Sequence, residues 1–413
     1  MRGKWGSSLG FILASSGAAV GLGNIQRFPY ITAEHGGAAF ILLYLACVVL
    51  LALPLMLVEF AIGRHTQRNP VCAIEKIKPN SPWKWVGVLG IFTAFFILSY
   101  YSVMGGWTIS YIFDAKTPSS LNTITYMALF LTLCAAIVSQ GVHKGIERAS
   151  KILMPLLLLI LVILVVHSLM LEGSEVGLAY YLKPDFSELD AKAFLYALSQ
   201  AFFSLCIGEA VLVTYGSYAS KGENLLASAG YIALFDTVVA ILAGLMIFPA
   251  LFAFNVAPTS GITLTFEVLP KLFAVIPYGA VFNVLFFVLL GFAALTTGIA
   301  LLEIPVIYLI DARGWKRMKA TFSVVVCAFI VGLPSGLSMT FYAMMDFIWG
   351  GLAMIIGGGL LAIFTGWVWG AKNAAKELEH GAPRFASISK IWGVLIKFVA
   401  PLLIGAILLS FFF

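Results

Sequence analysis

Three glycines interrupt a long apolar stretch near the start of the chain. Gly17, Gly21 and Gly23 lie inside the apolar segment from about 9 to 40, which is long enough to cross a bilayer. Each glycine costs a helix roughly 1 kcal/mol relative to alanine, so we expect the helix to break at membrane depth. Broken backbone at that depth must be buried in protein or line a cavity. Its free carbonyl groups can then coordinate a cation, and the amide groups that open the second half-helix can hold an anion.

A glycine-rich packing face between two helices is the alternative explanation of this stretch. Asn24 and Arg27 follow the glycines directly, and a lipid-facing packing stripe needs neither, so the sequence favours the break. A second stretch, from Gln200 to Glu209, places small residues, a glycine and a carboxylate in the middle of another apolar segment. We therefore expect a second discontinuous helix, with Glu209 at the start of its second half.

The elements that must position these stretches are membrane-spanning helices. Hydrophobic residues make up 61% of the chain and charged residues 11%, against roughly 25% charge in soluble proteins. The sequence predicts an all-α polytopic membrane protein with one membrane domain, 1–413, and eleven transmembrane helices. The apolar segments of spanning length lie at about 8–35, 38–62, 84–112, 122–140, 150–171, 194–218, 226–252, 278–310, 318–336, 342–370 and 391–412.

Lysine and arginine indicate the orientation of the chain in the membrane. With the N-terminus in the cytoplasm, 19 of the 25 lysines and arginines fall in cytoplasmic segments, so we expect the C-terminus outside. The pI near 9.0 follows from these loops and does not indicate a nucleic-acid partner. Two outer loops are long, 173–192 and 256–277, and an amphipathic stretch at 264–273 predicts a short helix in the second. Five scattered cysteines show no disulfide or metal-site spacing.

Several separated motifs resemble one transporter family. The stretch from Ala19 to Asn24, followed by Arg-Phe-Pro-Tyr at 27–30, is similar to the first transmembrane helix of the neurotransmitter:sodium symporter family. Residues 144–148 and 294–297 extend the resemblance, which is greatest to the bacterial amino-acid-transporting, leucine-transporter-like branch. It implies a leucine-transporter-type fold with two inverted five-helix repeats, at about 1–171 and 190–370, whose first and sixth helices are broken. The helix at 391–412 lies beyond this core.

The resemblance also implies a function. It indicates a sodium-coupled secondary active symporter that imports an amino acid by alternating access across a bacterial-type inner (plasma) membrane, as a monomer or weak dimer. The alternatives are an ion channel, for which a filter signature is lacking, and a proton-coupled carrier of a small amine or other solute. An enzyme is not expected, because no His-Glu-x-x-His, Gly-x-Ser-x-Gly or phosphate-binding motif occurs.

Sodium needs about five or six hard oxygen ligands, which backbone carbonyls and hydroxyls supply with little added charge. The resemblance implies one or two sodium ions and no chloride. One sodium ion is expected at Gly17, Val20, Ala293, Thr296 and Thr297. The other is expected at Ala19, Asn24, Ser204 and Asp236.

Asp236 stands where relatives often have an amide. Chloride-dependent relatives bind chloride near the positions of Tyr44, Gln200 and Ser204. Because Asp236 brings a negative charge to the cation, we expect no chloride requirement. The alternative is that Asp236 only bonds a neighbouring helix.

Gly21 stands where the monoamine branch has an aspartate that meets the amine. Glycine leaves that place open, so we expect the substrate to bring its own carboxylate, as an amino acid does. The resemblance directs this carboxylate to the N–H groups of Leu22 and Gly23 and to the Tyr101 hydroxyl. The residues implied in substrate binding are Ala18, Ala19, Gly21, Leu22, Gly23, Ile97, Tyr101, Phe203, Ser204, Cys206, Glu209, Thr297, Gly298 and Leu301.

Relatives usually have an aromatic or aliphatic residue where this chain has Glu209. A carboxylate in the pocket can recognise a polar or cationic substrate side chain, or carry a proton. It can equally turn away and bond a helix end or water. The sequence leaves these interpretations open.

Two charged pairs resemble gates that flank the broken helices. The outer pair is expected to bridge above the pocket when it closes, and the inner pair to latch the cytoplasmic end. Surface ion pairs worth ~1 kcal/mol or less are the alternative for each. The gate residues are Arg27 and Asp346 outside, and Arg2 with Asp311, assisted by Trp5, Ser217 and Tyr218, inside.

Overall fold

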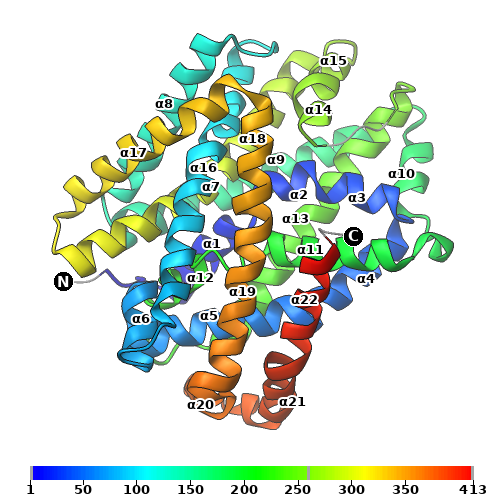
Figure 1. Cartoon of the computed structure of the whole chain (residues 1–413). Helices are drawn as coiled ribbons and strands as arrows, with labels where there is room; N and C mark the ends of the chain where they lie inside the picture. The colour runs from blue at the N-terminus through cyan, green and yellow to red at the C-terminus, as the bar shows by residue number, and fades with distance from the viewer. Residues whose placement is uncertain (1–2, 258–260, 411–413) are drawn as a thin grey trace.

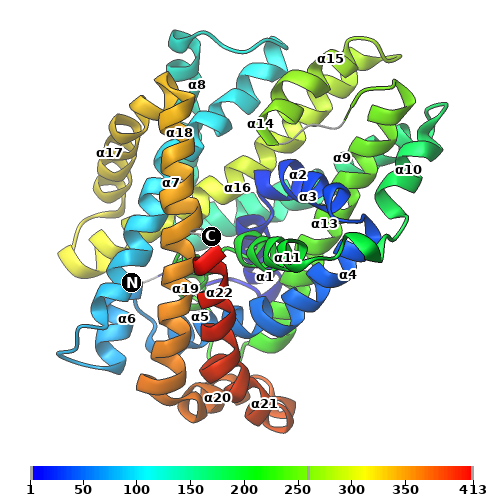
Figure 2. The ribbon, with the colours of Figure 1, turned by 45° about the vertical axis from the view of Figure 1, so that its right-hand side comes forward.

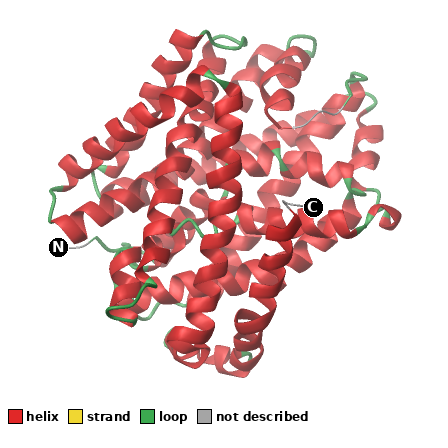
Figure 3. Ribbon diagram, viewed as in Figure 1, coloured by secondary structure: helices red, strands yellow, loops and turns green. Residues whose placement is uncertain are grey.

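Helices and loops make up the described part of the chain, residues 3–257 and 261–410 of a computed structural model (Figure 3). The helices, with π-helical or 3-10 segments marked η, are α1 (Ser8–Ala19), α2 (Leu22–Gln26), α3 (Phe28–Glu34), α4 (Ala38–Cys47), η1 (Val48–Ala52), α5 (Leu53–Thr66), α6 (Pro70–Ile77), α7 (Lys84–Phe113), α8 (Ser120–Val138), η2 (Val142–Glu147), α9 (Arg148–Leu169), α10 (Ser174–Leu182), η3 (Phe186–Glu188), α11 (Ala191–Ser204), α12 (Val211–Gly216), α13 (Leu225–Ala253), α14 (Gly261–Thr263), η4 (Leu264–Val268), α15 (Leu269–Phe273), α16 (Gly279–Arg313), α17 (Arg317–Leu337), α18 (Met339–Met345), η5 (Asp346–Ala353), α19 (Met354–Ile363), η6 (Phe364–Gly370), α20 (Ala371–Glu379), η7 (Pro383–Ser387), α21 (Ser389–Val394), η8 (Leu395–Val399) and α22 (Ala400–Ser410).

Nine helical stretches of the described chain are long and apolar enough to span a membrane, and a bent pair at the N-terminus makes ten. Their bounds agree with the predicted segments to within a few residues, except that the helix expected to begin near 150 starts at Val142 and the one expected to end near 370 continues to Glu379. The sixth predicted segment is divided into α11 and α12, which are each too short to span. The count of eleven therefore stays a prediction that depends on counting this divided segment as one span.

The first helix breaks where the sequence predicts. α1 ends at Ala19, α2 begins at Leu22, and the two halves meet at an angle of 56°. Val20 and Gly21 between them have extended backbone. The Asn24 side chain accepts a hydrogen bond from the Gly21 N–H at 3.0 Å, so the second half starts with its own capping interaction.

The sixth helix is also broken, over six residues from Leu205 to Ala210. Cys206, Gly208 and Ala210 have positive φ angles of 52°, 90° and 61°, which end the helical hydrogen bonding. A Cβ at Gly208 would collide with the carbonyl oxygen of Met354 in α19. Glycine is therefore required there both by the backbone angle and by the close approach of α19.

Shorter helices cover the two ends of the molecule. α10, α14 and α15 lie at one end, and the hairpin of α20 and α21 lies at the other (Figures 1 and 2). The helix predicted in the second outer loop is confirmed by the helical run Gly261–Phe273. The first loop contains α10, which its acidic and polar sequence did not predict; Tyr181 anchors that helix by stacking on Phe248 of α13.

Candidate functional site

A cavity of about 230 Å³ lies where the two broken helices meet. It is lined by most of the residues implied in substrate binding, namely Ala18, Ala19, Gly21, Leu22, Gly23, Ile97, Tyr101, Phe203, Cys206, Glu209, Thr297 and Leu301. Two of the implied residues lie elsewhere. The Ser204 hydroxyl donates to Asp236, and Gly298 packs against Phe130 and Cys134.

Other cavity-lining residues were not assigned to the pocket from the sequence. Tyr100 lines the wall and donates a hydrogen bond from its hydroxyl to Asp346 Oδ1 at 2.9 Å. Its ring also meets Tyr342 edge-on, with 5.2 Å between centroids. Tyr100 lies one helical turn after Ile97, so helical spacing alone was a signal for it. Gln26, Gly261 and Ile262 also line the cavity.

Buried oxygen atoms gather around Asp236 on one side of the first break. Asp236 Oδ2 accepts from the Ser204 hydroxyl at 2.7 Å and from the Tyr44 hydroxyl at 3.4 Å. Asn24 Nδ2 donates to Asp236 Oδ1 at 2.7 Å and to Ser204 Oγ at 3.2 Å. This brings together three of the four residues expected at one sodium site, and Ala19 ends the helix next to them.

A second group of oxygens joins α1 to α16. The Thr297 hydroxyl lies 3.2 Å from the Ala18 carbonyl oxygen and 3.5 Å from that of Gly17. The Thr296 hydroxyl donates to the Ala293 carbonyl at 3.0 Å, and a Cβ on Gly17 would lie 3.0 Å from Thr296 Cβ. Val20, the fifth expected residue, lies in the break itself.

Both groups consist of carbonyl, hydroxyl, amide and carboxylate oxygens, which suit a hard monovalent cation. Within the described residues, no three His, Cys, Asp or Glu side chains are grouped as a transition-metal site would need. The donor sets thus fit sodium, which in a coupled carrier is a co-transported substrate.

Glu209 lines the cavity, but its position in the helix differs from the prediction. α12 begins at Val211, so Glu209 belongs to the unwound segment and not to the second half-helix. The neighbouring amide of Gly208 donates to Glu59 Oε1 of α5 at 2.7 Å. Glu59 is buried and was missed from the sequence, although a carboxylate inside an apolar span is itself a signal. The Glu59 carboxylate gives the Gly208 N–H a hydrogen-bond acceptor, because the unwinding of the sixth helix leaves this N–H without a helical carbonyl.

The outer gate residues face the same cavity without forming an ion pair. Arg27 and Asp346 both line it, and among the described side chains they do not approach within 4.0 Å of each other. The Arg27 guanidinium instead lies 5.3 Å from the centre of the Phe203 ring. The bridge expected between these two residues is therefore not formed here, and their role as an outer gate stays a prediction.

The inner end is held by the N-terminal segment. Trp5 donates from its indole to the Tyr215 carbonyl at 3.0 Å and from its backbone N–H to the Tyr218 carbonyl at 3.3 Å. Glu147, which the sequence did not mark as a gate residue, accepts from the Gly6 N–H at 2.6 Å and the Ser7 hydroxyl at 2.9 Å.

The remaining inner-gate predictions have mixed outcomes. Arg2 lies outside the described residues, so its pairing with Asp311 stays a prediction. Asp311 Oδ2 accepts from the backbone N–H and the side chain of Asn69, at 3.1 and 3.3 Å. The Ser217 hydroxyl donates to the Thr214 carbonyl at 2.6 Å.

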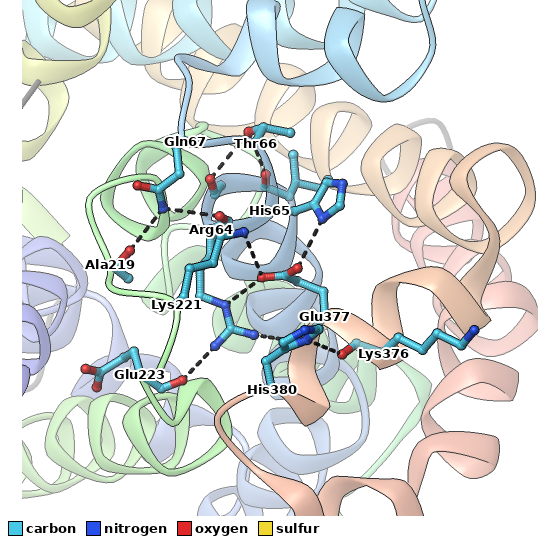
Figure 4. Close-up of polar contacts among 12 residues, drawn as sticks. Arg64, His65, Thr66, Gln67, Ala219, Lys221, Glu223, Lys376, Glu377 and His380 are labelled. Atoms are coloured by element: carbon cyan, nitrogen blue, oxygen red, sulfur yellow. Dashed lines mark hydrogen bonds and ion pairs between the residues drawn. The ribbon is translucent and has the colours of Figure 1, made fainter.

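A buried ion pair near this end was also missed. Arg64 in α5 donates from Nε to Glu377 Oε1 of α20 at 2.8 Å, and from a terminal nitrogen to the Glu223 carbonyl at 2.6 Å (Figure 4). Its other terminal nitrogen donates to the Glu377 carbonyl. Arg64 and Glu377 are 313 residues apart, so no local pattern could pair them.

Comparison with known proteins agrees with this architecture. The model of the sodium:neurotransmitter symporter family matches residues 2–123 and 119–413. The chain belongs to this family. It is 36% identical to the uncharacterized sodium-dependent transporter YhdH of Bacillus subtilis, over 98% of this chain and 97% of YhdH. It is also 36% identical to an uncharacterized sodium-dependent transporter of Haemophilus influenzae, over 99% of this chain and 98% of that protein.

A solved structure shows the same fold. The crystal structure of MhsT in complex with L-phenylalanine superposes with a TM-score of 0.89 at 40% identity, covering 99% of this chain and 100% of that one. The symporter described here is thus a multi-pass membrane protein of leucine-transporter-type fold, in a family of sodium-dependent transporters. The boundaries of its two predicted repeats, 1–171 and 190–370, stay a prediction.

Proposed function

We propose that this symporter uses the sodium gradient to import an amino acid by alternating access, without a chloride requirement. The observation that carries the proposal is the cavity between the two broken helices, with a group of oxygen ligands on either side of the first break. We also propose that the N-terminus lies in the cytoplasm of a bacterial-type cell, because most lysines and arginines then fall in cytoplasmic segments.

The geometry at Gly21 supports a substrate that carries a carboxylate. A Cβ at this position would lie 3.1 Å from the Thr297 hydroxyl and 3.5 Å from the Tyr101 hydroxyl. The glycine therefore leaves room in the cavity beside the Tyr101 hydroxyl, which is free to donate, whereas the Thr297 hydroxyl already donates to the Ala18 carbonyl. The first amide groups of α2, which lack partners within their own helix, line the same wall. Together these donors suit a carboxylate, which an amino acid brings and a monoamine does not.

Uptake of radiolabelled amino acids into proteoliposomes tests the proposal. With sodium outside, we expect saturable uptake above the equilibrium level, and with potassium at the same pH we expect none. The Thr296→Ala, Thr297→Ala double variant should lose uptake, because it removes both hydroxyls expected to bind one sodium ion, of which the Thr297 hydroxyl connects α16 to α1. Undiminished uptake without sodium would refute sodium coupling, and non-saturable flux would favour a channel.

Sodium-dependent uptake that is confined to amines without a carboxylate would refute the substrate class while leaving sodium coupling intact. A pH gradient that drives uptake in the absence of sodium would instead favour the proton-coupled carrier.

A further inference from the structure

A groove of about 800 Å³ lies between the last two spans and shares no lining residue with the substrate cavity. Residues of η6 and α20 line one side, and residues of α21 and η8 line the other. The helices α19 and α22 run side by side, and the hairpin of α20 and α21 closes the end of the molecule (Figures 1 and 2).

Lysines line both walls of this groove. Lys372 and Lys376 lie one turn apart on α20, and Lys390 and Lys397 face them from the opposite helix. Glu379 is the carboxylate in the lining, and none of the four lysines has a carboxylate within 4.0 Å in the part of the chain that the structure describes. Like charges that face each other across a groove repel, so an anion between them would stabilise the arrangement.

Lys397 lies deeper than the other three lysines. It follows Ser389, where α21 begins, by eight residues, or about 12 Å of helix, inside the apolar span Ser389–Ser410. Its ammonium lies 4.3 Å from the centre of the Trp367 ring and 5.6 Å from that of Phe398, and both rings are exposed. The charge is therefore held by aromatic faces at the boundary of the bilayer, where tryptophan is typical.

The shape of the groove is built into the two helices. The Trp367 indole donates to the Lys397 carbonyl at 3.0 Å, and a Cβ on Gly366 would lie 3.1 Å from Lys397 Cα, so the helices touch at the inner end. Gly370, with φ of 91°, then turns the chain away and opens the groove. Both walls include π-helical turns, η6 and η8, a distortion that is frequent at functional sites.

We propose that this groove binds the phosphate headgroup of an anionic phospholipid from the leaflet at that end of the protein. Basic pockets between transmembrane helices bind such headgroups, and the volume is in the usual range of ligand sites. The acyl chains would lie along the exposed apolar faces of α22 and η8, where Leu402 and Phe398 are exposed. The proposal is independent of the substrate and of the coupling ion.

Native mass spectrometry of the purified full-length protein in detergent tests the site. The probes are dioleoyl phosphatidylglycerol, dioleoyl phosphatidylcholine and sn-glycerol 3-phosphate. We expect one phosphatidylglycerol to be retained at concentrations where phosphatidylcholine is lost. Lys397→Gln should weaken retention about fivefold, and replacing all four lysines by glutamine should weaken it at least about twentyfold.

The matched control replaces four exposed lysines elsewhere on the predicted cytoplasmic loops, Lys78, Lys84, Lys144 and Lys316, by glutamine, and should retain the lipid. A variant with arginine at the four groove positions keeps the positive charges and should also retain the lipid. This variant keeps the test valid if the glutamine variant does not fold. Equal retention of both lipids, or an equal loss in the control, would overturn the proposal. Displacement of the lipid by millimolar glycerol phosphate would show a site for soluble anions instead.

Discussion

At the scale of single residues, Asp236 bears on the choice of ions. Its carboxylate accepts hydrogen bonds from the hydroxyls of Tyr44 and Ser204, two of the positions near which the family resemblance places chloride in chloride-dependent relatives. These donors are therefore already occupied by a built-in negative charge. Gln200, the third such group, has both side-chain polar atoms buried without a hydrogen-bond partner in the described structure.

We predict that replacing chloride by gluconate leaves wild-type uptake unchanged. Asp236→Asn keeps the shape and removes the charge, so this variant should lose uptake or regain it only with chloride. The measurement is sodium-driven uptake in proteoliposomes in the two salts. Asp346→Asn, the same change at a carboxylate that lines the cavity and contacts Tyr100, is the control and should respond equally in both salts. A wild type that needs chloride would contradict this account of Asp236.

Glu209 is predicted to select the substrate side chain. It is 4% exposed and lines the cavity next to Cys206, in a part of the wall that is otherwise largely apolar. An ionised carboxylate there should favour a polar or cationic side chain over leucine or phenylalanine, because a buried charge needs a partner.

Competition assays with leucine, phenylalanine, glutamine and lysine check this prediction in Glu209→Gln and Glu209→Phe. Both variants should lose the preference for lysine by about tenfold, roughly the loss of one charge-assisted hydrogen bond. An unchanged ranking in both would show that Glu209 does not read the side chain. A changed ranking in Glu209→Phe alone would show that the volume of the side chain at position 209, and not its charge, sets the substrate preference.

At the scale of elements, the break in the sixth helix depends on Gly208. An alanine there would need φ near 90° and would collide with the backbone of α19, so we predict loss of uptake and a lower unfolding temperature for Gly208→Ala. Gly230→Ala in α13 is the control, since a Cβ there meets nothing within 4 Å. It should be neutral or stabilise by up to about 1 kcal/mol. Equal behaviour of the two variants in thermal unfolding and uptake would contradict the role of Gly208.

The breaks could be predicted because their cause is local. Three glycines before Asn24, and a glycine beside a carboxylate at 208–209, are visible in any window of the sequence. The length of the second break is not local: positive φ angles at Cys206 and Ala210 extend it, and between them Gly208 lies against α19 and donates to Glu59. Sequence reasoning therefore located Glu209 correctly in the pocket wall and wrongly in a helix.

At the scale of the whole molecule, contacts between distant segments decide what the sequence could not show. Glu147 anchors the N-terminal segment across 141 residues, and Arg64 meets Glu377 across 313. Family resemblance supplied the predicted sodium and gate positions, because aligned motifs carry long-range information that composition and periodicity lack. Residues outside the recognised motifs, such as Glu59 and Glu377, had no such support.

The Arg64 cluster ties three parts of the chain together at the predicted cytoplasmic end. α5 supplies Arg64, the segment before α13 supplies the Glu223 carbonyl, and α20 supplies Glu377 (Figure 4). The Glu223 side chain accepts from the Ser8 hydroxyl at 2.5 Å, so the cluster also reaches the start of the first helix. Arg64 is fully buried, and removing it would leave Glu377 buried without its main counter-charge.

We therefore predict that Arg64→Met lowers the free energy of unfolding by about 3–5 kcal/mol and that the Arg64→Met, Glu377→Leu double variant recovers part of this loss. His65→Gln is the matched control: His65 contacts the same carboxylate at 3.1 Å but is 43% exposed, so its loss should stay within about 1 kcal/mol. Thermal and chemical unfolding followed by tryptophan fluorescence measures all three variants. If the double variant is no more stable than Arg64→Met, or if Arg64→Met matches the control, the stranded charge of Glu377 is not what destabilises the protein, and the cluster does not hold the three segments together.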